Sequence, residues 1–584
     1  MRATRLTLLS GFSPIFTERR KRTISGTVPR SRSKPAAGSI PVPTSPSPSG
    51  ANAMAKTIES DVVIIGAGIS AAMVAEKLTE ETDAKIVIVE AGDKIFNLEE
   101  RFDRRARFLA YRENPWRGDH IRGQTGTGIQ SRSMAVGGLA LHWGGTTPRY
   151  SPEDFQVRSI YGVGYDWPFT YDDLDPFYQE AEERLGVAGS PGPAELDPRS
   201  KDYPLPPLPV SYNLAKLQEW GEKSGIPFWR NPVAKNSVPY QGRNVCTRCD
   251  TCSICPTGAK YTPDFTFQRL LNEGRIELYD RTLVRQLKLA EGSDVIDHAV
   301  ALDRDAPDEP IHFRANTFVL ASGYCWSTHL LLLSRSDRFP NGVANRSGMV
   351  GKFVTGHRSL NTYVEVPMKL YPGVYRSDSL LSKKFQRERP DRYVRHDLRI
   401  WESDVSRRPR LTDDEGKRLF GDALLNDWKK RTATGVARMR AYYDVIPAKE
   451  SALTLDSDRK NPWGDPLPRI DFADSEWSAQ LRQHTEDSIR GVFEQIVRAG
   501  GGKTLSTRVD SLQDHPGGGC RMGADPTSSV VDPEGRSHDH ENLWVVGAPT
   551  IVSSGCNNGT LTFAALSLRS ATALAKTLPA RTTD

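Results

Sequence analysis

Two stretches near opposite ends of the chain alternate most clearly between short apolar runs and polar breaks. In the first, the apolar runs 62–65 and 85–89 flank a mixed stretch, 69–80, which predicts a strand, a helix and a second strand. In the second, the apolar run 543–548 precedes a longer apolar stretch, 561–574, which predicts a buried strand followed by a helix. Strands that alternate with helices in this way are typical of an α/β protein with a largely parallel sheet.

The segments between these two stretches continue the pattern and then change it. An acidic helix is predicted at 172–185, strands at 276–278, 300–302 and 317–323, and a helix at 326–334. Residues 358 to about 510 instead suggest a separate sheet with its own helices. We therefore predict a Rossmann-like dinucleotide-binding fold that contains an inserted α+β substrate-binding domain.

A glycine-rich turn joins the first predicted strand to its helix. It has the form Gly66-x-Gly68-x-x-Ala71, in which the first glycine makes the turn and the second lets a pyrophosphate reach the helix N-terminus. Ala71 allows the helix to pack closely on the strand. Glu90, at the end of the second strand, can accept a hydrogen bond from a ribose hydroxyl. The arrangement predicts a dinucleotide site without distinguishing FAD from NAD.

A histidine and an asparagine near the C-terminus are candidates for chemistry. His515 follows Asp514 and precedes three glycines, 517–519, which we expect to bring the backbone close to a flat cofactor. Asn558 comes 43 residues after His515, directly before the apolar helix. The two side chains could meet at one face of a ring, although a surface turn and a helix cap would have the same residues. Asn557 is the alternative to Asn558.

Four cysteines lie within ten residues, at Cys246, Cys249, Cys252 and Cys255, with two residues in each gap. Four thiolates this close together could bind zinc or an iron–sulfur cluster. The bacterial ferredoxin run has three residues in its last gap, so the spacing departs from that motif. The alternative is a thiol-rich loop, or one disulfide pair, that only shapes a surface.

Composition bounds the function classes. The chain has 584 residues, of which 26% are charged and 38% hydrophobic, and it has no apolar run of 18 residues, so we expect no transmembrane segment. Residues 1–53 hold nine basic residues and one acidic residue, which leaves 69 basic and 71 acidic residues in the remainder. The folded part therefore gives no electrostatic argument for nucleic-acid binding.

We expect His538 and His540 to be solvated in a polar loop.

The N-terminal segment is rich in Arg, Ser, Pro and Thr and is expected to be disordered. It has no apolar core of the kind a secretory signal needs, but its composition suits an organelle transit peptide. The alternative is that Met54 is the true start of the protein. We expect a cytoplasmic location if the segment is not a targeting peptide.

Five ordered motifs make the chain resemble the glucose–methanol–choline (GMC) oxidoreductases, an FAD-dependent family. The resemblance covers roughly residues 58–578 and is nearest to pyranose oxidases and to flavoprotein subunits of bacterial sugar dehydrogenases. The matching blocks are Gly66-Ala67-Gly68 with Glu90-Ala91-Gly92, then 137–145, 166–174 and 345–351, and finally 515–523 with Asn558.

The resemblance implies a domain organisation and a set of FAD contacts. It implies an extension at 1–57, an FAD-binding domain at 58–357 with a Cys-rich loop at 246–260, a substrate-binding domain at 358–510, and a C-terminal FAD-binding and catalytic segment at 511–578. The implied FAD-binding residues are Gly66, Gly68, Ala71, Glu90, Gly137, Gly138, His142, Trp143, Gly144, Val284, Gly547, Ala548 and Asn558. His142 matches the position at which pyranose oxidases attach FAD covalently, although the Gly-Gly that follows Trp143 departs from their pattern.

The implied reaction is oxidation of a CH–OH group of a sugar or glycoside, with hydride transfer to flavin N5. His515 would be the base, because a neutral imidazole suits that role near pH 7, and Asn558 would orient the hydroxyl. The segment 395–401, with Asp404, suits a polar substrate. Sterols and long-chain alcohols are alternative substrates, and an electron-relay flavoprotein subunit is an alternative function. The electron acceptor would be O2, a quinone, or a cytochrome or small subunit.

Overall fold

The structure is a computed structural model, in which the first strand begins at Lys56. The structure describes residues 56–94, 98–116, 120–371, 379–387, 393–403, 411–413 and 415–582. The predictions for residues 1–55 and for Asp404 lie outside these ranges, as does the side chain of Asp514. Within the described ranges, no helix combines the length and apolarity needed to cross a membrane.

A seven-stranded sheet forms the first half of the fold. Its parallel core has the order β6-β2-β1-β9, with β17 also paired to β9, and β8 and β7 extend it as an antiparallel edge. Val62, Val63 and Ile64 are fully buried, as expected for a central strand that is covered on both faces. The strands are β1 (Lys56–Ile65), β2 (Ile86–Val89), β6 (Ile276–Tyr279), β7 (Thr282–Leu289), β8 (Ile296–Asp303), β9 (Pro310–Leu320) and β17 (Leu543–Val545).

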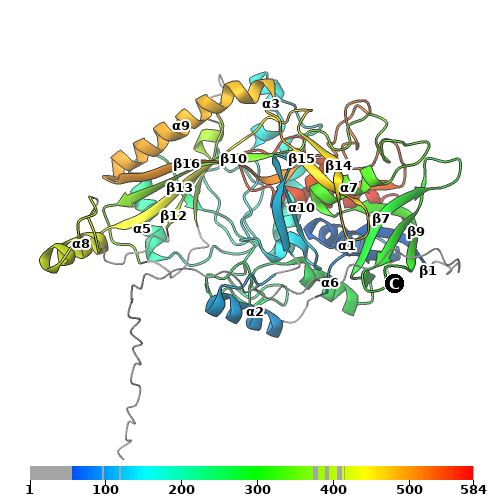
Figure 1. Cartoon of the computed structure of the whole chain (residues 1–584), viewed down its shortest axis with the longest axis horizontal. Coiled ribbons are helices and arrows are strands. Elements are labelled where there is room, and N and C mark those ends of the chain that lie inside the picture. The colour runs from blue at the N-terminus through cyan, green and yellow to red at the C-terminus, as the bar shows by residue number, and fades with distance from the viewer. Residues whose placement is uncertain are drawn as a thin grey trace, which may run out of the picture. The chain divides into compact units, whose positions relative to one another are not determined.

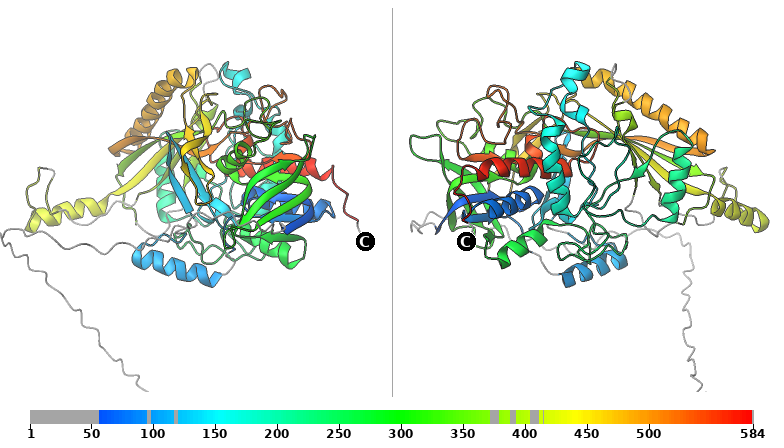
Figure 2. Two further views of the ribbon diagram at one scale, coloured as in Figure 1. Left: turned by 45° about the vertical axis from the view of Figure 1, so that its right-hand side comes forward. Right: turned by 180° about the vertical axis from the view of Figure 1, so that it is seen from behind.

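Helices from both ends of the chain pack together against this sheet. Figure 2 shows α1 (Ile69–Glu81), in blue, beside α10 (Thr560–Ala575), in red, with α4 (Tyr171–Leu185) next to α10. Both α1 and α10 present small buried residues, among them Ala71 and Ala564, which let the helix axes approach closely. The N- and C-terminal segments therefore complete one structural unit.

A six-stranded antiparallel sheet forms the second half, in the order β16-β10-β13-β12-β11-β5. Helices α9 (Glu476–Gly500) and α5 (Tyr212–Glu222) pack on one face of it, where α9 runs along the sheet in Figure 1. The strands are β5 (Trp229–Arg230), β10 (Thr355–Val366), β11 (Leu380–Ser382), β12 (Leu398–Glu402), β13 (Gly435–Tyr443) and β16 (Lys503–Gly517). Strand β5 comes from a segment far from the others in sequence.

Alternation along these strands separates the two faces of the second sheet. Leu398 and Ile400 of β12, and Met439 of β13, belong to the apolar core beneath the helices. Residues at the intervening positions, such as Arg399 and Arg440, therefore project from the opposite face. That face carries polar and aromatic side chains and continues toward the first sheet.

The remaining elements connect and cover the two sheets. They are α2 (Leu98–Tyr111), β3 (His120–Thr125), β4 (Gly128–Ser133), α3 (Val157–Tyr161), α6 (Pro263–Asn272), α7 (Gly323–Leu333), α8 (Gly421–Ala433), β14 (Ala452–Lys460) and β15 (Pro466–Asp471), with short 3-10 turns at Gly138–Leu141, Pro152–Phe155, Lys384–Gln386 and Ala548–Thr550. The architecture is mixed α/β with one mostly parallel and one antiparallel sheet, and it confirms the predicted fold class.

Candidate active site

A cavity of about 580 Å³ is bounded by the β1–α1 turn, the end of β2, the loop after Gly137, β7, and the C-terminal segment. Its size lies in the range of ligand and cofactor sites. It brings together eleven of the predicted residues: Gly66, Gly68, Glu90, Gly138, His142, Trp143, Gly144, Val284, His515, Ala548 and Asn558. Ala71, Gly137 and Gly547 do not line it, because each packs behind the wall.

The β1–α1 turn leaves room for a phosphate group. Gly66 has φ +100°, and a Cβ atom there would lie 2.8 Å from the Ser322 Cα. A Cβ on Gly68 would meet nothing nearer than 4.0 Å, because this position faces the cavity. Gly68 is also the N-cap of α1, where no side chain caps the helix. The backbone N–H groups at this end can therefore bind a pyrophosphate.

Glu90 lies at the end of β2 with its carboxyl group inside the wall of the cavity. It accepts hydrogen bonds of 2.9 Å from the backbone N–H groups of Ala67 and Gly92. Burial raises the pKa of Glu90 to about 7, although these backbone donors act in the opposite direction. The carboxyl group therefore holds the β1–α1 turn in place, and Glu90 lines the cavity.

The loop that starts at Gly137 docks on the phosphate turn. Gly137 donates its N–H to the Ala67 carbonyl at 2.8 Å, and a Cβ on Gly138 would lie 3.2 Å from the Gly68 Cα. Lys260 supports the loop from behind by donating to the carbonyls of Leu141 and Trp143, each at 2.9 Å. Burial lowers the pKa of Lys260 to about 7. No sequence motif marked this lysine.

The Cys-rich loop packs beneath the same part of the cavity wall. Ile254 shares a small apolar cluster with Trp116 and Leu141, and the Trp116 indole N–H donates to the Ser253 carbonyl at 2.6 Å. The four cysteines are free thiols, and across the described ranges no group of three or more His, Cys, Asp or Glu side chains is arranged to hold a metal. The thiols as placed do not fit a metal centre, and the loop supports the cofactor wall.

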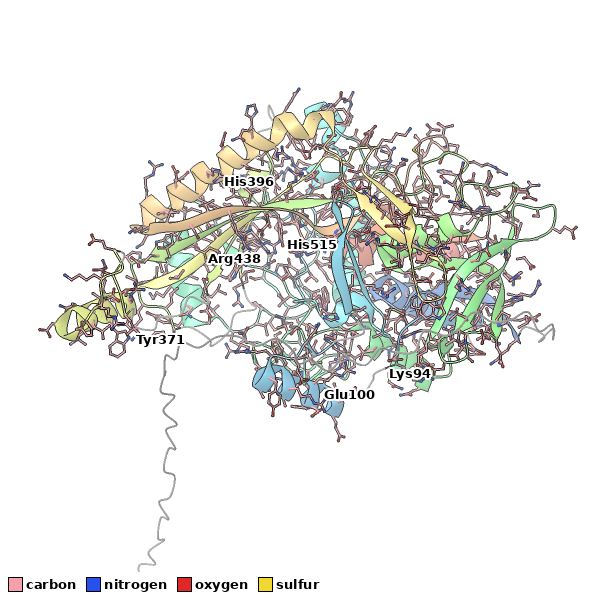
Figure 3. All side chains as sticks on the ribbon, viewed as in Figure 1. Lys94, Glu100, Tyr371, His396, Arg438 and His515 are labelled. Atoms are coloured by element: carbon pink, nitrogen blue, oxygen red, sulfur yellow. The ribbon has the colours of Figure 1, made fainter. Side chains whose placement is uncertain are left out.

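His515 lies at the end of β16, where Figure 3 labels it on the six-stranded sheet, and it lines the cavity. Its φ is +47°, an uncommon left-handed conformation for a residue with a side chain. Its Nε2 lies 2.7 Å from Asn558 Nδ2, and its Nδ1 lies 2.8 Å from His357 Nε2. The structure therefore brings the predicted histidine and asparagine together and adds a second histidine.

These contacts set the tautomer of both rings. An amide N–H of Asn558 can only donate, so His515 Nε2 must accept and the neutral ring must hold its hydrogen on Nδ1. That hydrogen is donated to His357 Nε2, so His357 holds its own hydrogen on Nδ1. His515 Nε2 thus presents a lone pair toward the cavity, which is the state that a general base requires.

His357 is fully buried on β10, and its ring packs 4.2 Å from the ring of Tyr442. Nothing in the local sequence distinguishes it, because its contact with His515 arises from the pairing of β10 with β16, two strands that are distant in sequence. The strand register would have been the only signal, and it is not visible without the fold.

The structure distinguishes the two neighbouring asparagines. Asn557 is fully buried, and its amide donates to the Arg149 carbonyl at 3.1 Å, away from His515. Asn558 lines the cavity and contacts the imidazole. Asn558, rather than Asn557, is therefore the asparagine that lines the cavity beside His515.

Two predictions about the C-terminal segment are wrong. A Cβ on Gly518 would overlap the Phe353 carbonyl, and a Cβ on Gly519 would lie 2.6 Å from Thr328 Oγ1, so these glycines accommodate protein atoms and not the cofactor. His540 is 1% exposed, not solvated, and its Nε2 accepts the Ala344 N–H at 2.9 Å. Local polarity did not reveal either close tertiary contact.

Known proteins resemble this chain in sequence. The family model for GMC oxidoreductase matches residues 447–567. The large subunit of fructose dehydrogenase from Gluconobacter japonicus is 30% identical over 547 residues, which cover 89% of this chain and 98% of that protein. The 6'''-hydroxyparomomycin C oxidase of Streptomyces lividus is 29% identical over 541 residues, which cover 89% of this chain and 92% of that protein.

Solved structures show the same fold at lower sequence identity. Formate oxidase from Aspergillus oryzae, whose FAD modification has been studied, superposes with a TM-score of 0.59 at 14% identity. The superposition covers 90% of this chain and 99% of that enzyme. The two-sheet arrangement around the cavity is therefore a known one.

Proposed function

Because this chain belongs to the GMC oxidoreductase family, we propose that it oxidises a CH–OH group of a sugar or glycoside, with His515 as the base. The observation that carries the proposal is the 2.7 Å contact between His515 Nε2 and Asn558 Nδ2 on the wall of the cofactor cavity. A base and a hydrogen-bond donor directed at one point suit a substrate hydroxyl.

FAD is the cofactor that the family implies, and the residues of the cavity fit it. The uncapped start of α1 and the open space beside Gly68 suit a pyrophosphate, and Glu90 suits a ribose. Bound FAD would supply the acceptor for the hydride that the substrate carbon loses. Gly144 lines the same cavity, and a Cβ atom on it would meet no protein atom within 4 Å. This position therefore leaves space for a ring system.

The side chains of His515 and Asn558 then bind the substrate hydroxyl, and His515 accepts its proton. A substrate hydroxyl that enters between His515 and Asn558 replaces their mutual hydrogen bond and donates to His515 Nε2. The Asn558 amide N–H donates to the same hydroxyl oxygen and fixes its direction. As His515 takes the proton it becomes an imidazolium, and its Nδ1–H bond to His357 strengthens because the donor is now charged.

Similarity to known enzymes supports a sugar or glycoside as the substrate. Fructose dehydrogenase and the hydroxyparomomycin oxidase align over nearly their whole lengths at about 30% identity. The cholesterol oxidase of Mycobacterium tuberculosis also aligns, but at 24% identity, so sterols are the second candidate. An electron-relay role without alcohol oxidation would leave the His515–Asn558 arrangement without a purpose.

We propose the kind of electron acceptor from the same relatives. A subunit of a sugar dehydrogenase would deliver electrons to a quinone or to a cytochrome or small subunit, whereas an oxidase would use O2. An iron–sulfur or zinc centre at Cys246, Cys249, Cys252 and Cys255 would need the thiols to rearrange from their present positions. Iron, sulfide and zinc analysis of the purified protein tests this directly. We also propose a cytoplasmic location.

Anaerobic reduction of the bound flavin tests the proposal. The purified protein is mixed with sugars, glycosides, sterols and fatty alcohols, and bleaching of the flavin absorbance is followed in the absence of O2. We expect bleaching by at least one sugar or glycoside, and its loss in His515→Ala. If no alcohol reduces the flavin while dithionite does, the protein is a relay and the proposal is wrong. Bleaching by sterols alone would select the second candidate.

A further inference from the structure

The face of the six-stranded sheet that points away from α9 carries arginines interleaved with aromatic rings. On β13, Arg438, Arg440 and Tyr442 occupy alternate positions on this face. On β12, Arg399 and Trp401 lie directly opposite Arg440 and Arg438. We call these five residues the arginine strip. Figure 3 labels Arg438 on this side of the sheet and His396 on the side of α9.

The arginine strip extends to the His357–His515 pair. The Arg440 guanidinium carbon lies 4.0 Å from the centre of the Tyr442 ring and 5.1 Å from that of Trp401, and the Arg438 carbon lies 4.9 Å from Trp401. At its other end, Tyr442 packs against His357 at 4.2 Å and His515 at 5.6 Å. The Tyr442 ring therefore lies between the Arg440 guanidinium and the imidazole of the base.

The positive charges of the strip are poorly balanced. Arg399 faces Arg440 directly across the strand pair, and like charges in this position destabilise a sheet. Arg399 has an ion pair with Asp397 at 2.7 Å. In the part of the chain that the structure describes, neither Arg438 nor Arg440 forms one. Arg438 donates instead to the neutral Asn361 Oδ1 at 3.0 Å.

The strip also has buried hydrogen-bond donors without partners. Arg399 is only 2% exposed, yet its Nη2 has no hydrogen-bond partner, and the Nε of Arg440 is likewise buried without one. Burial, followed by the charge of Arg440, lowers the pKa of Arg438. Unsatisfied buried donors are unfavourable, so a ligand with acceptor oxygens would bind favourably here.

Two described acids on this face of the sheet, Asp510 and Asp397, already have partners. Asp510, on β16, is held by the Asn361 amide at 2.7 Å and by Arg508 at 3.2 Å. Asp397 accepts the Tyr442 backbone N–H as well as the Arg399 side chain. Among the described residues, Asp397 therefore offsets Arg399, Asp510 is engaged by Asn361 and Arg508, and neither Arg438 nor Arg440 has an ion pair.

We propose that the arginine strip is an anion-binding subsite, and that the substrate is a sugar or glycoside with a carboxylate or phosphate group. Guanidinium groups bind planar oxyanions through two parallel hydrogen bonds, and stacking on aromatic rings holds them in the required orientation. The anion would lie between Arg399 and Arg440 while a hydroxyl of the same molecule lies at His515. This inference rests on the proposed function, since it specifies the substrate of that site.

Matched pairs of substrates test the subsite. Glucose 6-phosphate is compared with glucose, and methyl glucuronide with methyl glucoside, by anaerobic flavin reduction at low salt. For wild type we expect kcat/KM to favour the anionic member of at least one pair by 10-fold or more, and the pair concerned distinguishes phosphate from carboxylate. Arg440→Gln should remove about 10- to 100-fold of that preference, the effect of one hydrogen bond to a charged group, and leave the neutral substrate within twofold.

Two variants make the comparison specific. Arg482→Gln removes an arginine from α9, on the other face of the same sheet, where it pairs with Asp474 at 2.8 Å, and should change neither substrate. Arg440→Lys keeps the charge but not the forked geometry and should retain part of the preference. Flavin content and circular dichroism verify that each variant is folded, and Arg438→Gln serves as the second test if Arg440→Gln does not fold.

Two results would overturn the proposal. One is equal kcat/KM for the anionic and neutral members of both pairs in wild type, and the other is an equal loss for both members in Arg440→Gln. Calorimetric titration of the oxidised protein with each anion, without O2, separates this inference from the function. If no sugar reduces the flavin but an anion binds and Arg440→Gln abolishes its binding, the oxidation proposal fails and the subsite stands.

Discussion

Replacement of His357 by leucine gives a direct test of the two-histidine arrangement. The substitution removes the acceptor for the His515 Nδ1–H, which lies 2.8 Å away, and keeps the buried site filled beside Tyr442. His515 can then adopt the other tautomer, with its hydrogen on Nε2, in which it cannot act as a base. We expect slower flavin reduction with an unchanged flavin content, because no part of the dinucleotide site is altered.

The size of the effect follows from the change in charge during the reaction. A hydrogen bond between neutral groups contributes about 1 kcal/mol, and one from a charged donor about 1.5–3 kcal/mol. His515 is neutral before proton transfer and charged after it, so His357 stabilises the later state by about 0.5–2 kcal/mol more than the earlier one. This corresponds to a loss of about 2- to 30-fold in the reduction rate. His515→Ala should lose roughly 10²- to 10⁴-fold, the usual effect of a positioned general base.

Anaerobic stopped-flow reduction across pH is the assay. The wild-type rate should rise with pH as His515 becomes neutral, since only the neutral ring accepts the hydroxyl proton. In His357→Leu the imidazolium loses its acceptor, so the midpoint of this rise should move to lower pH, and in His515→Ala the rise should disappear. His357→Gln retains an acceptor oxygen and should recover part of the rate.

Two outcomes would refute this reasoning. A wild-type rate and pH profile in His357→Leu would mean that the ring does not set the tautomer of His515. A loss as large as that of His515→Ala would mean that His357 is itself required for proton transfer and not only for positioning. The two histidines form one hydrogen-bonded unit, so the double variant should lose less than the product of the single losses.

The remaining predictions concern the cofactor site and stability. Gly68→Ala places a methyl group in the space for the pyrophosphate, so the protein should purify with little FAD, as measured by its flavin-to-protein absorbance ratio. His142 lines the cavity, and acid precipitation tests whether it is linked to FAD: yellow colour in the pellet means a covalent bond, and colour in the supernatant means none. Burial lowers the pKa of His396 to about 4, so the folded state keeps it neutral while the unfolded state takes up a proton below pH 6.5. The free energy of unfolding should therefore fall by about 2 kcal/mol between pH 7 and pH 5 through this group, and urea titrations of His396→Asn should show that much less dependence on pH.

Local patterns predicted the cofactor-binding half of the fold well, for a physical reason. The turn at Gly66 and Gly68, the helix after it and the acid at Glu90 lie within 25 residues, so the interactions that define them are close in sequence. The predicted helix 69–80 and the helix 561–574 match α1 and α10 to within one residue at each end. Predictions of this kind depend on periodicity and turn chemistry, both of which are visible in the chain.

Residues that meet only through strand pairing could not be predicted in the same way. His357 reaches His515 across the register of β10 and β16, and Arg399 faces Arg440 across β12 and β13. The glycines after Pro516 looked like a cofactor contact because nothing local indicates that Phe353 and Thr328 lie against them. The cysteine spacing likewise suggested a metal, whereas the fold uses the loop to support Leu141 and Trp143 through Ile254 and Lys260.

The packing of α1 against α10 has a consequence for the order of events during synthesis. Helix α1 emerges from the ribosome early, but its small-residue face has no partner until α10, nearly 500 residues later, has been made. Strand β17 and Asn558 arrive at the same late stage, so the cavity lacks one wall until then. Contacts with such large sequence separation form slowly and leave partly folded chains exposed to aggregation. Cofactor capture must therefore follow completion of the chain, and the yield of folded protein in cells should depend on chaperones that protect α1 until α10 arrives.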